Sequence, residues 1–390
     1  MISVNEALGH LFELVTPLGT ETVPLRQTSG RVLARPVVAS RNQPPFAASV
    51  MDGYAVASEV VNPGDGFHVV GEAAAGRAFA GSIKHGEAVR IFTGAPLPEG
   101  AQRVVIQEDC SREGDWIVVA ENPDSKKYIR ELGADFKVGD EVKAPRRLDP
   151  ALIALVAAMN VPEVEVSRRP KVAILATGDE LVMPGEAPGP DQIIASNAFG
   201  IAAALEQEGA ETRILPIARD NEASLTACFD LAKGADLLVT IGGASVGDHD
   251  LVGKVAADLG MARAFYKIAM RPGKPLMAGR LNGRPAVGLP GNPVSSMVCS
   301  HIFLRPMVRA MQGLPKSAMP LRTAPLAEAI GANGPRQHYM RARYADGMLS
   351  VAERQDSALL SVLSDANALV VRPPHDPARG VGETVEFVIL

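Results

Sequence analysis

The sequence predicts a multidomain protein that combines a doubly wound α/β domain with an inserted β domain, an N-terminal helical region and a C-terminal β domain. Its 390 residues exceed what one hydrophobic core of ordinary size holds. Short alternating apolar runs fill residues 32–140, which is typical of a β domain. From residue 169 to residue 313, strand and helix patterns alternate, which indicates an α/β domain.

Two segments have the pattern of helices. Ser3 and Glu6 form a capping box ahead of an apolar stripe. Asp149 followed by Pro150 begins a second helix, which reaches Met159. We expect these two helices to pack together, with the β domain inserted between them.

Apolar runs bounded by Gly, Pro, Asp or Asn predict the two β domains. Examples in the inserted domain are Phe67–Val70, Ala88–Phe92 and Trp116–Val119, and the chain ends in a further run, Val385–Leu390. The predicted division is residues 1–47 with 134–168 for the N-terminal helical region, 48–133 for the inserted β domain, 169–313 for the α/β domain and 314–390 for the C-terminal β domain.

The α/β domain begins with Val172–Ala176, a continuous apolar run of the kind that a strand buried on both faces requires. A helix follows Ser196-Asn197, and then come a strand over 212–217, a helix to Lys233 and a strand over 237–241. This order predicts a parallel sheet with helices on both faces.

Composition argues against several classes of function. The net charge is −5 and aromatic residues make up 4%, so neither the positive charge nor the stacking platforms of a nucleic-acid-binding protein are present. No apolar run approaches the about 18–20 residues that span a bilayer, and the first residues lack a secretory signal. Three distant cysteines, Cys110, Cys228 and Cys299, fit neither a disulfide framework nor a zinc site. We expect a cytoplasmic protein with no nucleic-acid or membrane partner.

Two glycine-containing loops follow strands of the α/β domain. They are Thr177–Glu180 and Ile241–Asp250, and the second contains Gly242, Gly243 and Ser245. Ligands of open parallel sheets bind beyond the carboxyl ends of the strands, where glycines let backbone N–H groups wrap an anion. Neither loop matches a P-loop or a dinucleotide fingerprint. An ordinary tight turn explains a Gly-Gly pair equally well.

Acidic residues gather beside these loops: Asp179, Glu180, Asp220, Asp248 and Asp250. One or two carboxylates together with phosphate oxygens suit Mg²⁺. The alternative is helix capping, which is equally compatible with Asp220. Capping alone is a less complete explanation for Asp248 and Asp250, which lie two residues apart.

A basic stretch without acidic residues follows, and it consists of Arg263, Lys267, Arg271, Lys274, Arg280 and Arg284. In a chain of net charge −5, this imbalance indicates a pocket for an anion, and a solvated basic face is the alternative. Lys267, Arg271 and Lys274 are the sharper candidates for the pocket, because the stiff run Arg271–Pro275 would hold its side chains in place. Arg280 and Arg284 fit the solvated face better. Pro290–Ser296 then opens a helix whose N-terminus is either an anion site or a plain cap.

Several motifs follow one another along nearly the whole chain. They are Pro44-Pro45-Phe46, Met51–Ala55, Ile91–Ala95 with Pro98 and Gly100, Ile129-Arg130 with Gly133 and Asp135, Thr177–Leu181, Gly242-Gly243, Ser245–Asp248, Pro272–Pro275 and Pro290–Ser295. Together and in this order they resemble the molybdopterin molybdenumtransferase family, to which the gephyrin E domain is related. Gln102, Ile241 and Ala244 depart from the family pattern, and Arg271 stands where lysine is frequent.

The resemblance implies an elongated homodimer with four domains per chain, in which the N-terminal helical region serves dimerisation and the α/β domain binds molybdopterin. The implied cleft lies between the α/β domain of one subunit and the β domain of the other. The implied reaction is Mg²⁺-dependent cleavage of adenylyl-molybdopterin, which releases AMP, with insertion of molybdate into the dithiolene. Mg²⁺ is therefore the implied cofactor, and adenylyl-molybdopterin and molybdate are the implied substrates. Transient contact with other cofactor-assembly proteins is also implied.

The resemblance also implies site residues. Asp220 and Asp250 would be the metal ligands, and Asp52, Thr93, Asp135 and Glu180 would be further catalytic residues lining the cleft. The implied contacts to molybdate or cofactor are Lys267, Arg271, Lys274, Ser295, Gly242, Gly243, Ser245, Pro290, Pro293, Arg341 and Ser361. A turn role for Asp135 and a solvated strand face for Arg341 are the alternatives.

Two other functions share part of this pattern. Molybdopterin adenylyltransferases share the α/β domain but are usually single small domains, so the N-terminal motifs argue against that activity. The other alternative is a non-catalytic, gephyrin-like scaffold, and the presence of Asp220, Asp250 and Lys274 argues against it.

Overall fold

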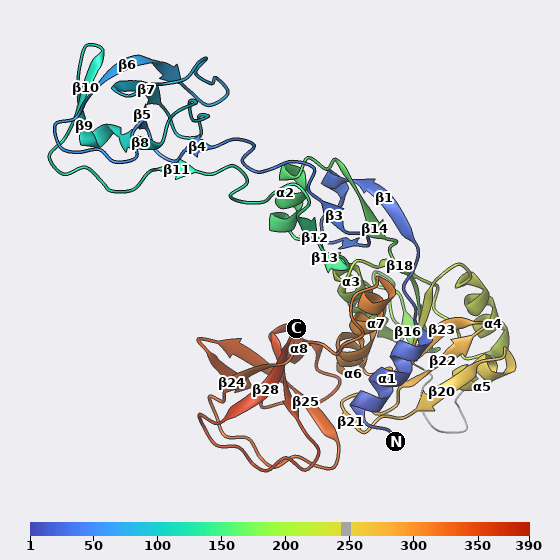
Figure 1. Cartoon of the computed structure of the whole chain (residues 1–390). Helices are drawn as coiled ribbons and strands as arrows, with labels where there is room; N and C mark the ends of the chain where they lie inside the picture. The colour runs from blue at the N-terminus through green and yellow to red at the C-terminus, as the bar shows by residue number, and fades with distance from the viewer. Residues whose placement is uncertain (243–250) are drawn as a thin grey trace.

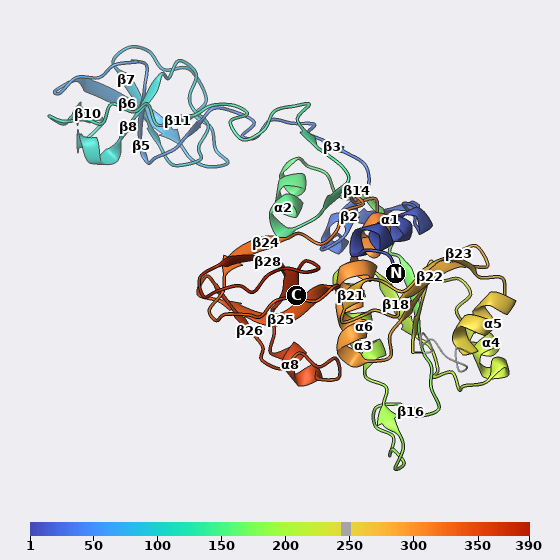
Figure 2. The ribbon, with the colours of Figure 1, turned by 90° about the horizontal axis from the view of Figure 1, so that it is seen from below.

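The structure is a computed structural model of the chain, and it describes residues 1–242 and 251–390. Figure 1 shows an elongated molecule: a β domain at one end, a second β-rich region in the middle, and an α/β domain beside a C-terminal β domain at the other end. The perpendicular view in Figure 2 agrees that the first β domain stands apart from the rest. The predicted fold class is therefore confirmed. No helix within the described ranges is long and apolar enough to cross a membrane.

The first helix, α1 (Val4–Leu14), begins at the predicted capping box. The Ser3 hydroxyl accepts a hydrogen bond from the Glu6 N–H at 3.2 Å, and the Glu6 carboxylate accepts one from the Ser3 N–H at 2.7 Å. The apolar stripe of α1, which includes Leu8 and Leu11, is buried in the core of the α/β domain.

The predicted packing of α1 against the second helix, α2 (Pro150–Ala158), is wrong. Leu152 and Val156 of α2 belong to a separate core in the middle region. The physical reason is that the N-terminus is anchored elsewhere, because Ile2 exchanges backbone hydrogen bonds with the segment around Lys267 of the α/β domain. The apolar stripe of α1 is thereby committed to that domain.

The middle region is built from chain segments on both sides of the inserted domain. Its main sheet has the order β1-β14-β2-β13, and β3 pairs with β12 where the chain leaves and returns. Their bounds are β1 (Thr20–Pro24), β2 (Val32–Leu33), β3 (Val37–Val38), β12 (Glu141–Val142), β13 (Arg146–Arg147) and β14 (Glu163–Ser167), with a short 3₁₀ turn at Leu25–Gln27.

The inserted β domain contains a sheet in the order β8-β5-β7-β6-β10-β9. Alternate residues of β5 (Gly53–Val56) enter cores on opposite faces of this sheet, since Tyr54 and Val56 belong to one core and Ala55 to the other. Its strands are β4 (Ala48–Ser49), β5 (Gly53–Val56), β6 (Gly66–Ala73), β7 (Glu87–Ile91), β8 (Arg103–Ile106), β9 (Cys110–Glu113), β10 (Trp116–Val119) and β11 (Ile129–Arg130), with a 3₁₀ turn at Gln107–Asp109.

The α/β domain has a sheet in the order β18-β15-β19-β23-β22-β20 with helices on both faces. Helices α3 (Asn197–Gln207), α6 (Pro293–Cys299) and α7 (Arg305–Met311) cover one face together with α1, and α4 (Glu222–Leu231) and α5 (Leu251–Asp258) cover the other. The strands are β15 (Lys171–Ala176), β18 (Glu211–Ile214), β19 (Leu237–Ile241), β20 (Ala262–Tyr266), β22 (Met277–Leu281) and β23 (Arg284–Leu289), with a small pair β16 (Leu181–Val182) and β17 (Ile193–Ile194).

The sheet is parallel only in part, which corrects the prediction of a parallel sheet. β18, β15, β19 and β23 are parallel, whereas β22 and β20 run antiparallel to their neighbours. The reason is the two-residue turn Asn282-Gly283, in which both residues have positive φ. An Asn-Gly turn of this kind closes a tight hairpin, and a hairpin is antiparallel.

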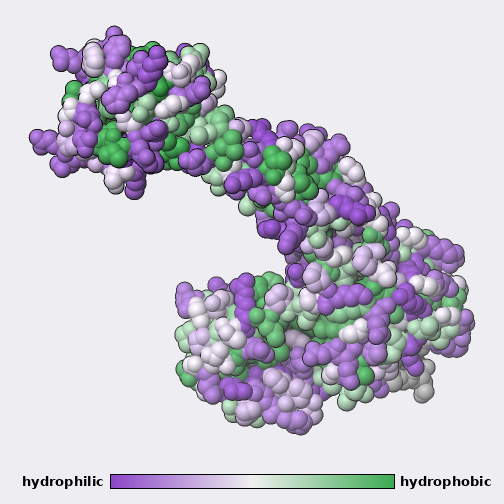
Figure 3. All heavy atoms as spheres, in the orientation of Figure 1, coloured by the Kyte–Doolittle hydropathy of each residue, from purple (hydrophilic) through white to green (hydrophobic). Residues whose placement is uncertain are grey.

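The C-terminal β domain is joined to the α/β domain by a shared sheet in the order β21-β25-β27-β28-β24. β21 (Met270–Arg271) belongs to the α/β domain by sequence, and it pairs with β25 (Gln337–Ala345) of the C-terminal domain. The other elements are β24 (Arg322–Pro325), β26 (Met348–Val351), α8 (Leu360–Ser364), β27 (Ala368–Arg372) and β28 (Thr384–Ile389), and a π-helical turn at Ser300–Leu304 joins α6 to α7. Figure 3 shows that the molecule curves around an open hollow between the inserted β domain and the C-terminal domain.

Candidate functional site

A cavity of about 680 Å³ lies beyond the carboxyl ends of β15, β19 and β23. This is the position at which open α/β sheets bind ligands. Its walls are the loop 176–181, the segment 193–198 and the loop 290–293, together with Asp220, Ile241, Gly242, Pro275 and Ala358. Five of the predicted site residues therefore share one cavity: Glu180, Asp220, Gly242, Pro290 and Pro293.

The glycine at the floor of the cavity has a packing role. Gly242 has a φ of +92°, and a Cβ atom at this position would lie 2.8 Å from the Thr177 carbonyl oxygen. The Thr177 N–H donates to the Ile241 carbonyl, and the Gly242 N–H donates to the Leu289 carbonyl. The predicted glycine loop thus allows neighbouring strand ends to approach closely.

The carboxylates on one wall are positioned by the backbone. Asp220 lines the cavity, and its N–H donates to the Asp179 carboxylate at 3.1 Å. The alternative that Asp220 caps helix α4 is not what the structure shows, because the Asn221 side chain accepts the capping hydrogen bond from Ser224. Asp220 is exposed and lines the cavity, so it is accessible to a ligand there.

Sequence reasoning missed two residues beside this wall. The Arg219 guanidinium donates to the carbonyl oxygens of Asp179 and Leu181, at 3.1 Å each, and so fixes the loop that carries Glu180. The Asn197 side chain donates to the Gly291 carbonyl at 2.8 Å and ties two walls of the cavity together. Their positions, next to Asp220 and at a predicted helix start, were the only signals available in the sequence.

Residues 267–276, called the basic loop here, reach the cavity at Pro275. The segment 267–276 connects β20 to β22, and the Ile268 N–H donates to the Lys274 carbonyl at 3.0 Å. Gly273 packs so closely on helix α6 that a Cβ atom there would lie 2.5 Å from the Cys299 sulfur. Pro275 lines the cavity, and the preceding residue, Lys274, is exposed.

Three other predicted cationic or hydroxyl residues lie around this loop. Ser295 is buried on α6, one helical turn before Cys299, against which the basic loop packs. Arg271 lies on β21 opposite His338 of the C-terminal domain, and its side chain is exposed. The Lys267 ammonium lies 5.2 Å from the centre of the Tyr266 ring, in a cation–π geometry.

The prediction that Arg284 belongs to a solvated face is wrong. Its guanidinium donates to the Ala232 carbonyl, and burial lowers its pKa from the ordinary value. The reason is that β23 begins beneath the end of α4, which the linear charge pattern does not reveal. Arg280 is also bound to backbone, with hydrogen bonds to the carbonyls of Gly283 and Glu13.

Arg341 is buried, so the solvated-face alternative is also wrong. Its guanidinium donates to the Gln355 side chain and to the backbone carbonyls of Arg354 and Asp356. Burial, with the nearby charge of Arg271, lowers the pKa of Arg341. Arg341 therefore holds the segment that ends at Ala358, a wall of the cavity.

Ser361 is not brought to the cavity. It is exposed on the short helix α8, whose Leu360 and Leu363 line a separate apolar groove against α3 and α6. The adjoining segment does reach the site, since the Val294 N–H donates to the Ser357 carbonyl at 3.0 Å. The C-terminal domain thus contacts the start of α6 through Ser357 rather than through Ser361.

Two predicted catalytic residues form a pair in the inserted β domain. The Asp52 carboxylate accepts hydrogen bonds from the Thr93 N–H at 2.8 Å and from the Thr93 hydroxyl at 2.9 Å. These bonds hold the pKa of Asp52 below its ordinary value. Asp135 lies on the connection to the middle region, where its N–H donates to the Gln43 carbonyl, which is a turn-like role.

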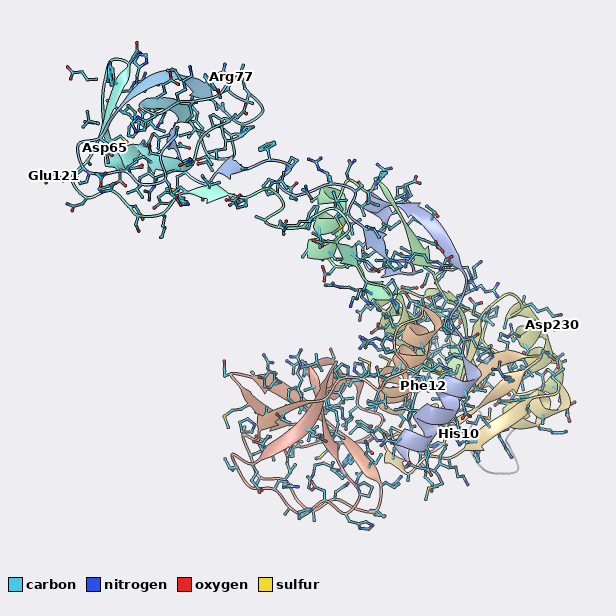
Figure 4. All side chains as sticks on the ribbon, viewed as in Figure 1. His10, Phe12, Asp65, Arg77, Glu121 and Asp230 are labelled. Carbon is cyan, nitrogen blue, oxygen red and sulfur yellow. The ribbon has the colours of Figure 1, made fainter. Side chains whose placement is uncertain are left out.

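One chain does not bring these β-domain residues to the cavity. Figure 4 places Asp65, Arg77 and Glu121 of the inserted domain at the opposite end of the molecule from Asp230 of the α/β domain. Figures 1 and 2 show the same separation between β5 and the sheet that carries the cavity.

Gly243, Ser245 and Asp250, with Ala244 and Asp248, lie outside the described residues. Within residues 1–242 and 251–390, no group of three or more His, Cys, Asp or Glu side chains is placed to hold a metal ion. Mg²⁺ is nevertheless compatible with the donors that are described, because Asp220 and Glu180 converge on one cavity and Mg²⁺ takes few protein carboxylates beside waters and phosphate oxygens.

Three family models match the chain in order: the MoeA N-terminal region (domain I and II) over residues 2–160, the probable molybdopterin binding domain over residues 173–310, and the MoeA C-terminal region (domain IV) over residues 323–390. A molybdopterin molybdenumtransferase of Nostoc sp. is 35% identical over 99% of this chain and 93% of its own length. The chain belongs to the molybdopterin molybdenumtransferase family. The predicted family and its enzyme class, a transferase, are confirmed.

Further relatives agree with this membership of the molybdopterin molybdenumtransferase family. The molybdopterin molybdenumtransferase of Haemophilus influenzae is 34% identical over 99% of this chain and 98% of its own length. The crystal structure of the molybdopterin biosynthesis MoeA protein from Pyrococcus horikoshii covers the whole of both chains with a TM-score of 0.86 and 26% identity. The similarity therefore extends over the complete domain arrangement.

Proposed function

We propose that this protein cleaves adenylyl-molybdopterin in a Mg²⁺-dependent reaction, transfers molybdate to the dithiolene and releases AMP. The observation that carries the proposal is the cavity beyond the sheet, which has carboxylates on one wall and a lysine loop at its rim. A polyanionic substrate needs both features, because a metal must be held at its phosphates and cations must hold the incoming oxyanion.

The carboxylate wall acts on the phosphate part of the substrate. Asp220 and Asp250 would hold Mg²⁺. Glu180 lines the same cavity as Asp220, and Arg219 keeps the Glu180 loop in place. A bound Mg²⁺ supplies charge neutralisation at the phosphate oxygens. Gly242, Pro290 and Pro293 shape the floor and wall on which the pterin part lies. Gly243 and Ser245 would contribute through the same loop.

The basic loop acts on molybdate. Lys274 and Arg271 are exposed, and Ser295 lies under the loop on α6, so the three can converge on an oxyanion at the rim of the cavity. Two opposite unit charges about 4 Å apart interact by about 4 kcal/mol at an effective dielectric near 20. More than one cation is therefore needed to hold a dianion beside an anionic cofactor.

We also propose that the active molecule is a homodimer. The Asp52–Thr93 pair matches the family motif, yet it lies at the far end of its own chain from the cavity. A second chain that places its β domain over the cavity would bring a carboxylate of depressed pKa to the substrate. Free cysteines suit a reducing compartment, so the proposed location is the cytoplasm.

A single-turnover assay tests the proposal. Purified protein is incubated with adenylyl-molybdopterin, Mg²⁺ and molybdate, and released AMP and cofactor-bound molybdenum are measured. We expect AMP and molybdenum-loaded cofactor in equal amounts. Binding without AMP release would indicate a scaffold instead, and formation of adenylyl-molybdopterin from ATP and molybdopterin would indicate an adenylyltransferase.

A further inference from the structure

A second polar cavity, of about 400 Å³, lies where the middle region, the α/β domain and the C-terminal domain meet. It shares no lining residue with the cavity beyond the sheet. Figure 1 shows β13, α3 and α7, three of the elements that form it, close together. Its charged lining residues are Arg147 on β13, Glu208 at the end of α3, Arg305 and Arg309 on α7, and Arg322 on β24.

One buried carboxylate serves several of these cations. The Glu208 carboxylate pairs with Arg147 at 2.8 Å and with Arg305 at 2.6 Å, and Arg309 lies at 4.0 Å from it. The side chain of Glu208 is 8% exposed, so the three guanidiniums converge on a site with little water. Arg147 and Arg305 are fixed in direction by these bonds.

The other two guanidiniums have spare hydrogen-bond donors. Among the described residues, the Arg309 guanidinium has one acceptor besides its distant contact with Glu208, namely the thioether sulfur of Met319 at 3.7 Å, a weak acceptor. Arg322 is exposed and forms no ion pair within the described part of the chain.

The cations therefore exceed the anions at this junction. Among the described residues, the side chains that line the cavity include four guanidiniums and one carboxylate, that of Glu208. Burial lowers the pKa of Arg147, and the charges of Arg309 and Arg305 lower it further against the opposing effect of Glu208. Like charges held together in this way are stabilised by a second anion.

We propose that this junction cavity binds inorganic phosphate. Arg309 and Arg322 would be its direct ligands, while Arg147 and Arg305, held by Glu208, add positive potential. The planar guanidinium fork matches two phosphate oxygens at once. A phosphate held by Arg309 and Arg322 would bridge α7 to β24 across the linker that contains Met319, and so would restrain the C-terminal domain.

Titration with inorganic phosphate, followed by calorimetry in phosphate-free buffer, tests this proposal. Because Arg271 and Lys274 also offer cations, all proteins carry the background changes Arg271→Ala and Lys274→Ala. We expect phosphate binding to persist in this background and to weaken at least about tenfold when Arg309→Gln and Arg322→Gln are added. The control pair Arg26→Gln and Arg343→Gln removes the same charge from exposed positions outside the cavity and should leave binding unchanged.

Two results would overturn the proposal. Loss of all phosphate binding in the background protein would mean that phosphate binds only at the other cavity. Equal affinity in the Arg309/Arg322 variant and its control would mean that the junction is not a binding site. Arg322→Gln alone provides a second variant, since Arg322 has no ion-pair partner among the described residues whose loss could unfold the chain. The experiment measures phosphate binding and not AMP release, so failure of this proposal can be distinguished from failure of the proposed reaction.

Discussion

Individual charged side chains around the candidate site are fixed mainly by backbone groups. Arg219 binds two carbonyls of the Glu180 loop, Arg341 binds two carbonyls of the segment before Ala358, and the Thr93 N–H binds Asp52. A side chain held in this way has already lost its rotamer freedom before a substrate arrives. These charged groups are therefore already in position before a substrate binds.

The Asp52–Thr93 pair gives a prediction at this scale. Both donors of Thr93 stabilise the ionised carboxylate, so removal of the hydroxyl in Thr93→Val should raise the pKa of Asp52 toward its ordinary value. The measurement is an NMR titration of the Asp52 carboxyl carbon. Thr22→Val, on exposed β1, is the control and should leave it unchanged. An unaltered Asp52 pKa in Thr93→Val would show that the hydroxyl bond has no effect.

His338 predicts a pH dependence of stability. Burial, with Arg271 as the next cause, lowers its pKa to about 4. An unfolded imidazole has a pKa of about 6.5, so between pH 6.5 and 4 the unfolded chain binds a proton that the native chain does not. The free energy of unfolding should therefore fall as the pH drops through this window, by at most about 1.4 kcal/mol per pH unit for this residue.

Thermal unfolding at pH 7 and pH 5 measures the effect. The midpoint of the wild-type protein should drop more between the two values than that of His338→Asn, which cannot be protonated. Burial also lowers the pKa of His301 to about 4, and His301 is present in both proteins, so part of the pH dependence of the unfolding midpoint remains in each. Identical slopes would show that His338 is not the source.

At the scale of elements, the site depends on how closely the strand ends approach one another. Gly242→Ala adds a Cβ atom 2.8 Å from the Thr177 carbonyl at a φ of +92°, whereas Gly185→Ala has a similar φ of +94° with open space around it. Positive φ alone costs of order 1–3 kcal/mol. Gly242→Ala should therefore destabilise the protein more than Gly185→Ala does, as measured by denaturant unfolding. Equal losses would mean that strand approach does not constrain Gly242.

Helices and strands that depend on neighbouring residues in the sequence could be predicted. Packing arrangements that depend on contacts with residues far away in the sequence could not. The capping box of α1, the Asp149-Pro150 start of α2 and the apolar run of β15 all depend on nearby residues. The docking of α1 on the α/β domain is decided by a backbone pairing with residues more than 260 positions away, near Lys267. The antiparallel hairpin of β22 and β23 also has a local signal, because an Asn-Gly pair such as Asn282-Gly283 is typical of a two-residue hairpin turn.

The same distinction applies to the site. Glu180, Asp220 and Gly242 could be predicted because the carboxyl ends of parallel strands meet at one edge of a sheet. The roles of Arg284 and Arg341 could not, because whether an arginine is solvated or buried depends on which carbonyls the tertiary fold presents to it. Asn197 and Arg219 act through backbone contacts across loops, which no spacing pattern encodes.

At the scale of the whole molecule, the extended shape predicts complementation between chains. If Asp52 of one chain serves the cavity of another, Asp52→Asn and Asp220→Asn should each be inactive alone. After subunit exchange, each mixed dimer has one intact site, so an equal mixture should recover about a quarter of wild-type AMP release. Native mass spectrometry verifies the exchange. Failure to recover any activity after verified exchange would mean that the two residues do not act in different chains.

The central claim is that the cavity beyond the sheet is where the adenylylated cofactor is cleaved, and the rate of AMP release by Asp220→Asn tests it most directly. Asp220 lines the cavity, whereas Asp230, on helix α4 of the same domain, is exposed, is paired with Lys233 and does not line the cavity, so Asp230→Asn is the matched control. If Asp220 holds Mg²⁺ as proposed, loss of its carboxylate charge should slow AMP release by about 10²-fold, or about 2.7 kcal/mol, with the fold unchanged. Wild-type AMP release in a correctly folded Asp220→Asn protein would contradict the claim.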